Sequence, residues 1–298
     1  MQSDKVGPVV AVGSFDGVHL GHRQILSRTM KLAEQFGATT AVLTFDPLPA
    51  QLVHPDFTFV LTPLAEKAAL FLELGIATVH VVRFDSTVQA EEPDVFVHKH
   101  LFPLSPAAVV VGHDHRFGRA RKGNIELLSR LLEAARVRLE VVPEFLLDGV
   151  PVRSTVIREH LLLGHVRRAA LLLGRPYSIA GRVVPGHGTG RRLGFPTLNI
   201  QVQDREKFVP ADGVYAVWAD IEGRIQPAVM NIGHRPTFGG EKRSIEVHLL
   251  DEKLEMPPLA AAVRFVERLR PERKFSDLSA LADRIAEDVA LARRILVG

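Results

Sequence analysis

The sequence of 298 residues contains no cysteine. Disulfide bonds, thiolate metal sites and cysteine nucleophiles are therefore excluded, and the composition suits a reducing compartment. The sequence also lacks an apolar run of the roughly 18 residues that a membrane span needs, and a basic N-terminal segment followed by an apolar core. We therefore expect a cytoplasmic protein with no membrane span, export signal or membrane partner.

A strong excess of positive charge is also missing. The formal net charge is only +3 although the pI is about 9.3. So small an excess creates no field that attracts a polymer, and we expect no nucleic-acid partner. A local basic cluster does occur at Arg116, Arg119, Arg121 and Lys122. It is interpreted either as a solvated loop or as a loop that contacts phosphate.

The stretch Gly13–His22, Gly-Ser-Phe-Asp-Gly-Val-His-Leu-Gly-His, is the most informative motif. It follows an apolar run at 8–12 and precedes an amphipathic segment at 22–36, which predicts a strand, a glycine turn and a helix. The backbone N–H groups at the start of such a helix attract phosphate, and His19 and His22 would add donors. Asp16 would supply an acceptor or an indirect metal contact.

The first half alternates short apolar runs with helical patterns, which predicts a doubly wound, mostly parallel sheet. Strands are expected at 39–45, 78–82, 107–111 and 137–142. Helices are expected at 93–101, 125–135 and 161–173, and another runs to Leu74 with Thr62 as its N-cap and Pro63 in its first turn. Ligands bind beyond the carboxyl ends of strands in such sheets. Gly112–Gly118 follows one such end, and Ser154, Thr155 and Arg158 follow another; helix capping is the simpler interpretation of the two hydroxyls.

We expect a domain boundary near Gly174, giving domains 1–174 and 175–298. Beyond it, short alternating strands predict a small antiparallel barrel, closed by a helix at 277–296. The expected strands are 178–184, 197–200, 214–220, 225–232, 244–250 and 262–269.

The second half also carries a set of polar residues. Gly186, Gly188 and Gly194 belong to a loop that either forms a surface hairpin or brings backbone amides to phosphate. Thr197 and Asn199 share one strand face and offer the oxygen ligands that magnesium prefers. Glu246 and His248 also share a face, so Glu246 is a candidate general base if that face lines a pocket.

Taken together, these motifs resemble the bacterial bifunctional riboflavin kinase/FAD synthetase family over nearly the whole chain. The resemblance rests on Gly13–His22, Gly112–Gly118, Ser154–Arg158, Gly194–Asn199, Asn231–Phe238 and Ser244–His248. It implies an enzyme whose barrel half phosphorylates riboflavin with ATP to give FMN. The sheet half would then transfer AMP from ATP to FMN, giving FAD and pyrophosphate. The expected assembly is a monomer or a weak homo-oligomer.

The resemblance also implies residue roles. His19, His22, Arg158 and Glu246 would be catalytic, and Mg²⁺ would be held by Thr197 and Asn199. ATP and its phosphates would contact Gly13, Phe15, Asp16, Gly17, Gly21, Asp114, Ser154, Thr155, Gly186, Gly188 and Gly194. The flavin would contact Asn231, Arg235, Thr237 and Phe238.

The sequence departs from the family pattern at three places. His115 replaces the usual phenylalanine, Leu198 replaces alanine in Pro-Thr-Ala-Asn, and Met256-Pro257-Pro258 replaces a usual Tyr-Gly. The first and third departures motivate an alternative in which only one activity is retained and the other half binds flavin or nucleotide. A nucleic-acid-binding protein, suggested by the pI, is the third hypothesis.

Overall fold

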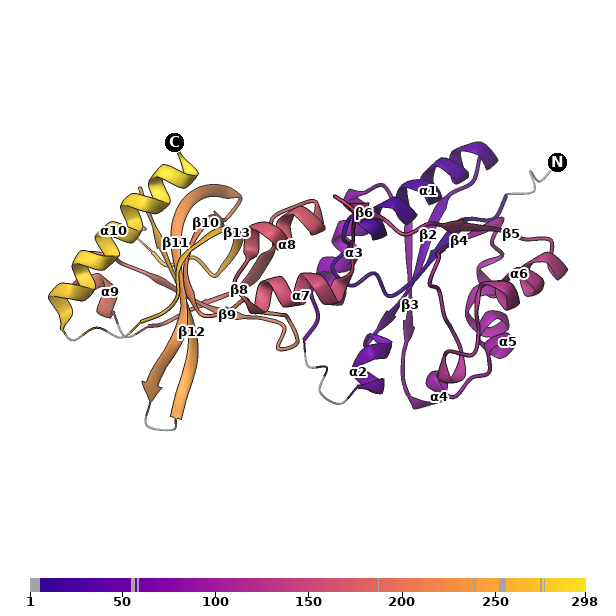
Figure 1. Ribbon diagram of the computed structural model, residues 1–298, viewed down its shortest axis with the longest axis horizontal. Coiled ribbons are helices and arrows are strands. Elements are labelled where there is room, and N and C mark those ends of the chain that lie inside the picture. Colours follow the sequence, from indigo (N-terminus) through magenta and orange to yellow (C-terminus); the bar gives the residue numbers. More distant parts are fainter. Residues whose placement is uncertain are drawn as a thin grey trace. The chain divides into compact units, whose positions relative to one another are not determined.

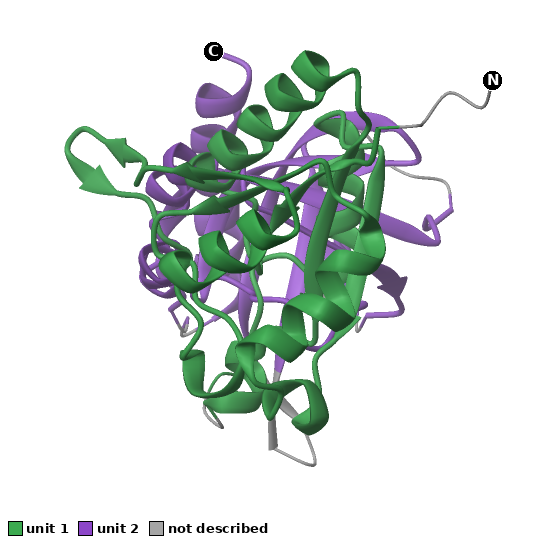
Figure 2. Cartoon of the chain, turned by 90° about the vertical axis from the view of Figure 1, so that its right-hand side faces the viewer, with its two compact units in different colours: residues 1–154 green, residues 155–298 purple. Residues whose placement is uncertain are grey.

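The computed structural model describes residues 6–54, 57, 59–186, 188–237, 240–251, 256–273, 275 and 277–298; for residues 189, 235–237 and 240–242 it describes the backbone only. The chain divides into two compact units, residues 1–154 and 155–298 (Figure 2). The domain boundary expected at 174 stays a prediction.

Unit 1 is built on a parallel sheet of five strands in the order β3-β2-β1-β4-β5 (Figure 1). The strands are β1 (Val9–Val12), β2 (Thr40–Asp46), β3 (Thr78–Arg83), β4 (Ala108–Gly112) and β5 (Arg138–Val142). Since β1 pairs with both β2 and β4, the order reverses between β1 and β4. Such a switch point leaves a crevice at the carboxyl ends of the two strands, where the loops after Val12 and Gly112 begin.

Helices cover both faces of this sheet, which confirms the doubly wound fold. On one face, Val9 and Ala11 belong to apolar clusters with residues of α1 (Leu20–Phe36) and α3 (Leu64–Glu73). On the other face, Val10 and Val12 share a cluster with residues of α6 (Ile125–Ala134). The remaining short elements are α2 (Pro49–Val53), α4 (Ser86–Gln89), α5 (Pro93–Phe96), η1 (Val97–Leu101), η2 (Phe102–Leu104), η3 (Arg119–Arg121) and the hairpin β6 (Leu146–Leu147) and β7 (Val150–Pro151).

Unit 2 contains a closed antiparallel barrel of six strands in the order β10-β11-β12-β9-β8-β13, as the sequence predicted. The elements are α8 (Val166–Leu173), β8 (Ser178–Val184), α9 (Thr189–Arg192), β9 (Leu198–Val202), β10 (Gly213–Ile221), β11 (Arg224–Thr237), β12 (Gly240–Leu249), β13 (Ala260–Arg270) and α10 (Leu278–Leu296). Figure 1 shows α10 lying along the barrel, where Val289 and Ala292 join an apolar cluster with Val214 and Val229.

Two predicted helices differ from the structure. The segment expected as one helix at 161–173 is divided into α7 (Ser154–Leu162) and α8, because Gly164 adopts a left-handed φ of 74°. A glycine enters this region without the steric penalty of a side chain. Thr62 does not cap α3, which begins at Leu64 after Pro63; its hydroxyl instead accepts the N–H of Gly17 at 2.8 Å.

Strands β11 and β12 run further than predicted. They pair from Ala228 with Leu249 to Thr237 with Gly240, whereas the pairing of β11 with β10 ends at Ile232. Pro236 therefore lies on a part of β11 that pairs on one side only, where a sheet tolerates proline. The sequence predicted these two strands at 225–232 and 244–250.

Candidate active sites

The turn between β1 and α1 places His19 and His22 together. His19 caps α1, and its Nδ1 accepts the backbone N–H of His22 at 3.3 Å. The two rings stack with centroids 3.5 Å apart. Because a backbone N–H can only donate, a neutral His19 carries its ring proton on Nε2. The first turn of α1 contains no acidic side chain, which leaves its positive end uncompensated by charge within that turn.

Gly21 and Phe15 fix this arrangement. A Cβ at Gly21 would lie only 3.2 Å from the His19 ring, so a larger residue would press on the stacked pair. Phe15 adopts a left-handed φ of 52°, and its buried ring meets Phe71 and His22 edge to face. The predicted phosphate-binding residue Phe15 is thus part of the core, and its backbone strain is compensated by packing.

Several predicted phosphate-binding groups of the turn are engaged within the protein. The N–H of Gly13 donates to Leu43, and that of Gly17 donates to Thr62. The buried Asp16 carboxylate accepts the N–H groups of Leu61 and Thr62 at 3.0 and 3.1 Å. A phosphate contact at Gly13 or Gly17 would therefore rest on close backbone approach, and the binding roles of all three residues stay predictions.

Sequence reasoning missed Lys67, a residue of α3. Its Nζ donates to the carbonyls of Ser14 and Phe45 at 3.1 and 3.2 Å, although the side chain is 1% exposed. Burial lowers the pKa of Lys67 to about 8, against the opposing effects of Asp16 and Asp46. A lysine in a helical apolar pattern gave no signal that its amine would reach the ends of two strands.

A cavity of about 490 Å³, here called the sheet cavity, lies next to this turn. Its wall is largely apolar and includes Gly13, Phe45, Phe96, Phe117 and His115. The His115 ring stacks on Phe117 with centroids 5.6 Å apart. Burial lowers the pKa of His115 to about 4, while Asp114 raises it and Arg121 lowers it further. At neutral pH the cavity therefore presents an uncharged imidazole. Asp114 itself is exposed.

The structure joins Ser154 to the turn. Its hydroxyl donates to the backbone carbonyl of Asp16 at 2.8 Å, across 138 residues of sequence. Ser154 is the first residue of α7, and Thr155 and Arg158 follow in unit 2. The ATP contacts expected for Thr155 and Arg158 stay predictions.

In the barrel, polar side chains from three strands meet on one rung. Glu246 of β12 is paired with Asn231 of β11 on one side and with Asn199 of β9 on the other. Directly opposed residues of antiparallel strands project to the same face. Thr197, just before β9, donates its hydroxyl to Glu246 at 3.3 Å. The structure thus brings together four residues that the sequence singled out separately, and Leu198 is paired with the buried Val247.

These residues lie at a cavity of about 310 Å³, here called the barrel cavity. Thr197, Asn231 and Glu246 form part of its wall, and Leu281 and Ile285 of α10 form an apolar part. Sequence reasoning missed several further lining residues, namely Arg270, Glu272, Phe275 and Asp288. The position of α10 depends on contacts that no local pattern reveals.

The glycine-rich loop is placed in part. A Cβ at Gly186 would lie 2.1 Å from the Asn199 amide, so this glycine permits close approach to a predicted metal ligand. Gly188 and Gly194 have positive φ angles of 71° and 86°. Of the predicted flavin contacts, Phe238 and the side chains of Arg235 and Thr237 lie outside the described residues.

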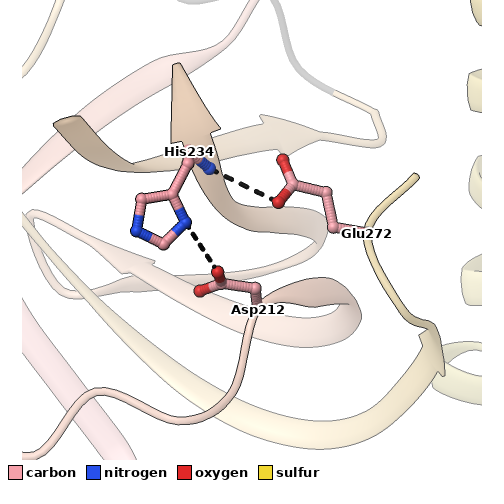
Figure 3. Close-up of side chains that lie close together, drawn as sticks. All are labelled: Asp212, His234 and Glu272. Atoms are coloured by element: carbon pink, nitrogen blue, oxygen red, sulfur yellow. Dashed lines mark hydrogen bonds and ion pairs between the residues drawn. The ribbon is translucent and has the colours of Figure 1, made fainter. Parts of the chain in front are cut away.

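A second polar cluster holds Glu272 at the edge of the barrel cavity (Figure 3). The ring Nδ1 of His234 lies 2.8 Å from Asp212 Oδ2, and the backbone N–H of His234 donates to Glu272 at 3.4 Å. Arg243 also bonds to Asp212 at 2.7 Å. Because an arginine already compensates Asp212, the cluster is a set of links between loops and β11, and we assign no metal to it.

Comparisons with known proteins assign a domain family to each half of the chain. Residues 1–156 match the family model described as FAD synthetase, and residues 173–296 match the model described as riboflavin kinase. Proteins named bifunctional riboflavin kinase/FMN adenylyltransferase are similar along nearly their whole length. The one from Pseudomonas fluorescens is 37% identical, covering 97% of this chain and 93% of its own. The one from Bacillus subtilis (strain 168) is 34% identical, covering 97% and 92%.

The chain belongs to the bifunctional riboflavin kinase/FMN adenylyltransferase family. It contains an FAD synthetase domain and a riboflavin kinase domain. The expected function is thereby confirmed: the protein is an enzyme with both riboflavin kinase and FMN adenylyltransferase activities.

A solved structure shares the fold of this chain. It is titled as a macrolide-efflux protein from Streptococcus pneumoniae, has 28% sequence identity and a TM-score of 0.89, and covers 98% of this chain and 95% of its own. Its title describes that protein alone. Within the described residues of the present chain, no helix has the length and apolar character needed to cross a membrane.

Proposed function

We propose that the riboflavin kinase reaction takes place at the rung Asn199–Glu246–Asn231. Glu246 accepts the proton of the terminal ribityl hydroxyl of riboflavin while that oxygen forms a bond to the γ-phosphorus of ATP and ADP leaves. A positioned base of this kind typically contributes about 10²–10⁴-fold in rate. The apolar wall supplied by Leu281 and Ile285 suits a flavin ring, with Asn231 as its polar contact.

The single observation that carries this proposal is the convergence of Thr197, Asn199 and Glu246 on one face. The Thr197 hydroxyl is 3.3 Å from Glu246, and Asn199 is directly opposite Glu246. Hydroxyl, amide and carboxylate oxygens are hard donors, so the set fits Mg²⁺ held by Thr197 and Asn199. The ion, when bound, would neutralise phosphate charge during transfer.

For the FAD synthetase domain, we propose that His19 and His22 donate to the triphosphate of a second ATP. A phosphate oxygen of FMN forms a bond to the α-phosphorus, and pyrophosphate leaves. Ser154 of the same unit holds this nucleotide; Thr155 and Arg158 are proposed to bind phosphate alone, since a planar guanidinium suits phosphate oxygens. The largely apolar sheet cavity provides a site for a planar ring of either substrate. The proposed setting is a cytoplasmic monomer or weak homo-oligomer that acts without nucleic-acid or membrane partners.

The test follows riboflavin, FMN and FAD over time by chromatography, with ATP and magnesium present. The wild-type protein should form FMN first and FAD afterwards. Glu246→Gln should stop FMN formation but still convert supplied FMN to FAD. His22→Ala should accumulate FMN, because loss of a donor to developing charge costs about 10²–10³-fold.

Two outcomes would contradict the assignments. Retention of FMN formation by Glu246→Gln would exclude this residue as the base. Formation of FAD from FMN at the wild-type rate by His22→Ala would exclude this histidine as a donor to the triphosphate.

A further inference from the structure

The segment that carries Thr197 lies beyond the end of a strand ladder. The pairing of β12 with β9 consists of Glu246 with Asn199 and Val247 with Leu198, and β9 begins at Leu198. Strand β12 continues to Leu249, so His248 stands where a partner at Thr197 would be next. The position of Thr197 is therefore not set by regular strand pairing.

His248 reaches this segment with its side chain. Its Nδ1 lies 2.8 Å from the backbone oxygen of Pro196, and its ring meets Phe195 edge to face with centroids 5.5 Å apart. A carbonyl oxygen only accepts hydrogen bonds, so Nδ1 carries the proton and donates. The imidazole thus binds the residue directly before Thr197 from the strand that also carries Glu246.

We propose that His248 is a positioning residue of the kinase reaction, which holds the Pro196 carbonyl and thereby keeps the Thr197 hydroxyl next to Glu246. This inference rests on the proposed roles of Thr197 and Glu246. Small displacements of a group that positions a reactant can reduce rates by about 10²-fold. The hydrogen bond from His248 to Pro196 is therefore expected to affect turnover, although His248 touches no reacting atom.

The segment has a second support, which makes the proposal testable without loss of the fold. The Phe195 N–H donates to Gly190 of α9 at 2.8 Å. A Cβ on Gly190 would lie 2.4 Å from the Phe195 oxygen, so the two backbones are in close contact. Removal of the His248 contact should therefore free Pro196 and Thr197 locally and leave the barrel assembled.

The experiment compares His248→Leu, which removes the donor but keeps apolar bulk, with His248→Asn, whose amide can place an N–H near the position of Nδ1. Riboflavin phosphorylation is measured as kcat and KM. Binding of Mn²⁺ in the presence of ADP is measured by the electron paramagnetic resonance signal of the free ion. This measurement needs no turnover. Adenylylation of supplied FMN by the same chain controls for folding.

His248→Leu should lower kcat by about 10- to 100-fold and weaken Mn²⁺ binding, with the KM for riboflavin and FMN adenylylation unchanged. His248→Asn should restore most of both losses. The positioning role is overturned if the leucine variant keeps wild-type kcat and Mn²⁺ binding, if only KM rises, or if both variants lose activity equally.

Thr197→Ala and Glu246→Gln are assayed in parallel to separate the positioning role of His248 from the proposed kinase site itself. If they abolish phosphorylation while His248→Leu remains fully active, only the positioning role fails. If they retain full activity, the proposed kinase site fails, and the role of His248 fails with it.

Discussion

At the scale of single residues, Lys67 links the chemistry of the turn to protein stability. Its ammonium is buried and bonded to two strand-end carbonyls, and burial lowers its pKa from 10.5 to about 8. The unfolded chain therefore binds a proton more tightly than the folded protein between these values. By linkage, the charged lysine opposes folding by about 3 kcal/mol well below pH 8, and this penalty declines as the pH rises toward 10.5.

We predict that the wild-type protein gains stability relative to Lys67→Met as the pH rises. The difference in unfolding free energy should shift by about 2 kcal/mol in favour of the wild type between pH 7.5 and 9.5. Denaturant unfolding of both proteins across this range measures it. Lys31→Met, at an exposed position of α1, should show no such shift. If the unfolding free energies of the wild type and Lys67→Met changed with pH in parallel, the Lys67 amine would keep an ordinary pKa in the folded protein.

At the scale of elements, a buried carboxylate of α10 forms an ion pair with a barrel strand. Asp288 of α10 is 2% exposed and accepts hydrogen bonds from Nη2 and Nε of Arg270 in β13, at 2.8 and 3.0 Å. Arg284 of α10 also pairs with it at 3.3 Å. Arg270 and Asp288 line the barrel cavity. Because Leu281 and Ile285 of the same helix form the apolar wall, the ion pair also helps to set the width of the proposed flavin site.

Asp288→Ala should therefore destabilise the protein and weaken riboflavin binding together. Arg270 is 13% exposed, so loss of its carboxylate partner should cost less than the about 3–5 kcal/mol of a fully buried charge, whereas replacement of both charges by apolar residues is often neutral. Asp288→Ala should thus show a lower unfolding free energy in denaturation and a higher KM for riboflavin. Arg270→Met/Asp288→Leu should recover the stability. Glu287→Ala, at an exposed neighbour, is the matched control. An Asp288→Ala protein with wild-type stability would contradict this account.

Sequence patterns predicted elements well where the determining contacts are local. Glycine turns and apolar periodicity located the sheet strands, the barrel strands and α10 to within a few residues. They failed at Gly164, because the leucines on both sides continue the apolar pattern while a Cβ there would lie 2.6 Å from Arg268. They failed at Thr62 because its partner, Gly17, is 45 residues away. Both errors arise from contacts distant in sequence.

At the scale of the whole molecule, prediction of the sites had the same limit. Alternation placed Glu246 and His248 on one face, and the register adds Asn199 and Asn231. The link between Ser154 and Asp16 joins residues 138 positions apart, and only the folded chain reveals it. Motif resemblance compensated for this limit because it names residues without the need to know their distances.

The whole chain also contains two cavities that are lined by separate units. Every residue that lines the sheet cavity belongs to unit 1, and every residue that lines the barrel cavity belongs to unit 2. Damage to one cavity should therefore leave the other reaction intact. FMN, the product of the first reaction and substrate of the second, would then be able to pass between different molecules through solution.

We therefore predict that a mixture of Glu246→Gln and His22→Ala proteins converts riboflavin to FAD, although neither variant does so alone. FAD should appear after a lag during which free FMN accumulates, and the lag should shorten as the concentration of the Glu246→Gln protein rises. A Glu246→Gln/His22→Ala double variant mixed with either single variant is the control and should form no FAD from riboflavin. Failure of the mixture, with each single variant active in its remaining reaction, would show that FMN must be transferred within one chain, because the separate sites would then be coupled by more than diffusion.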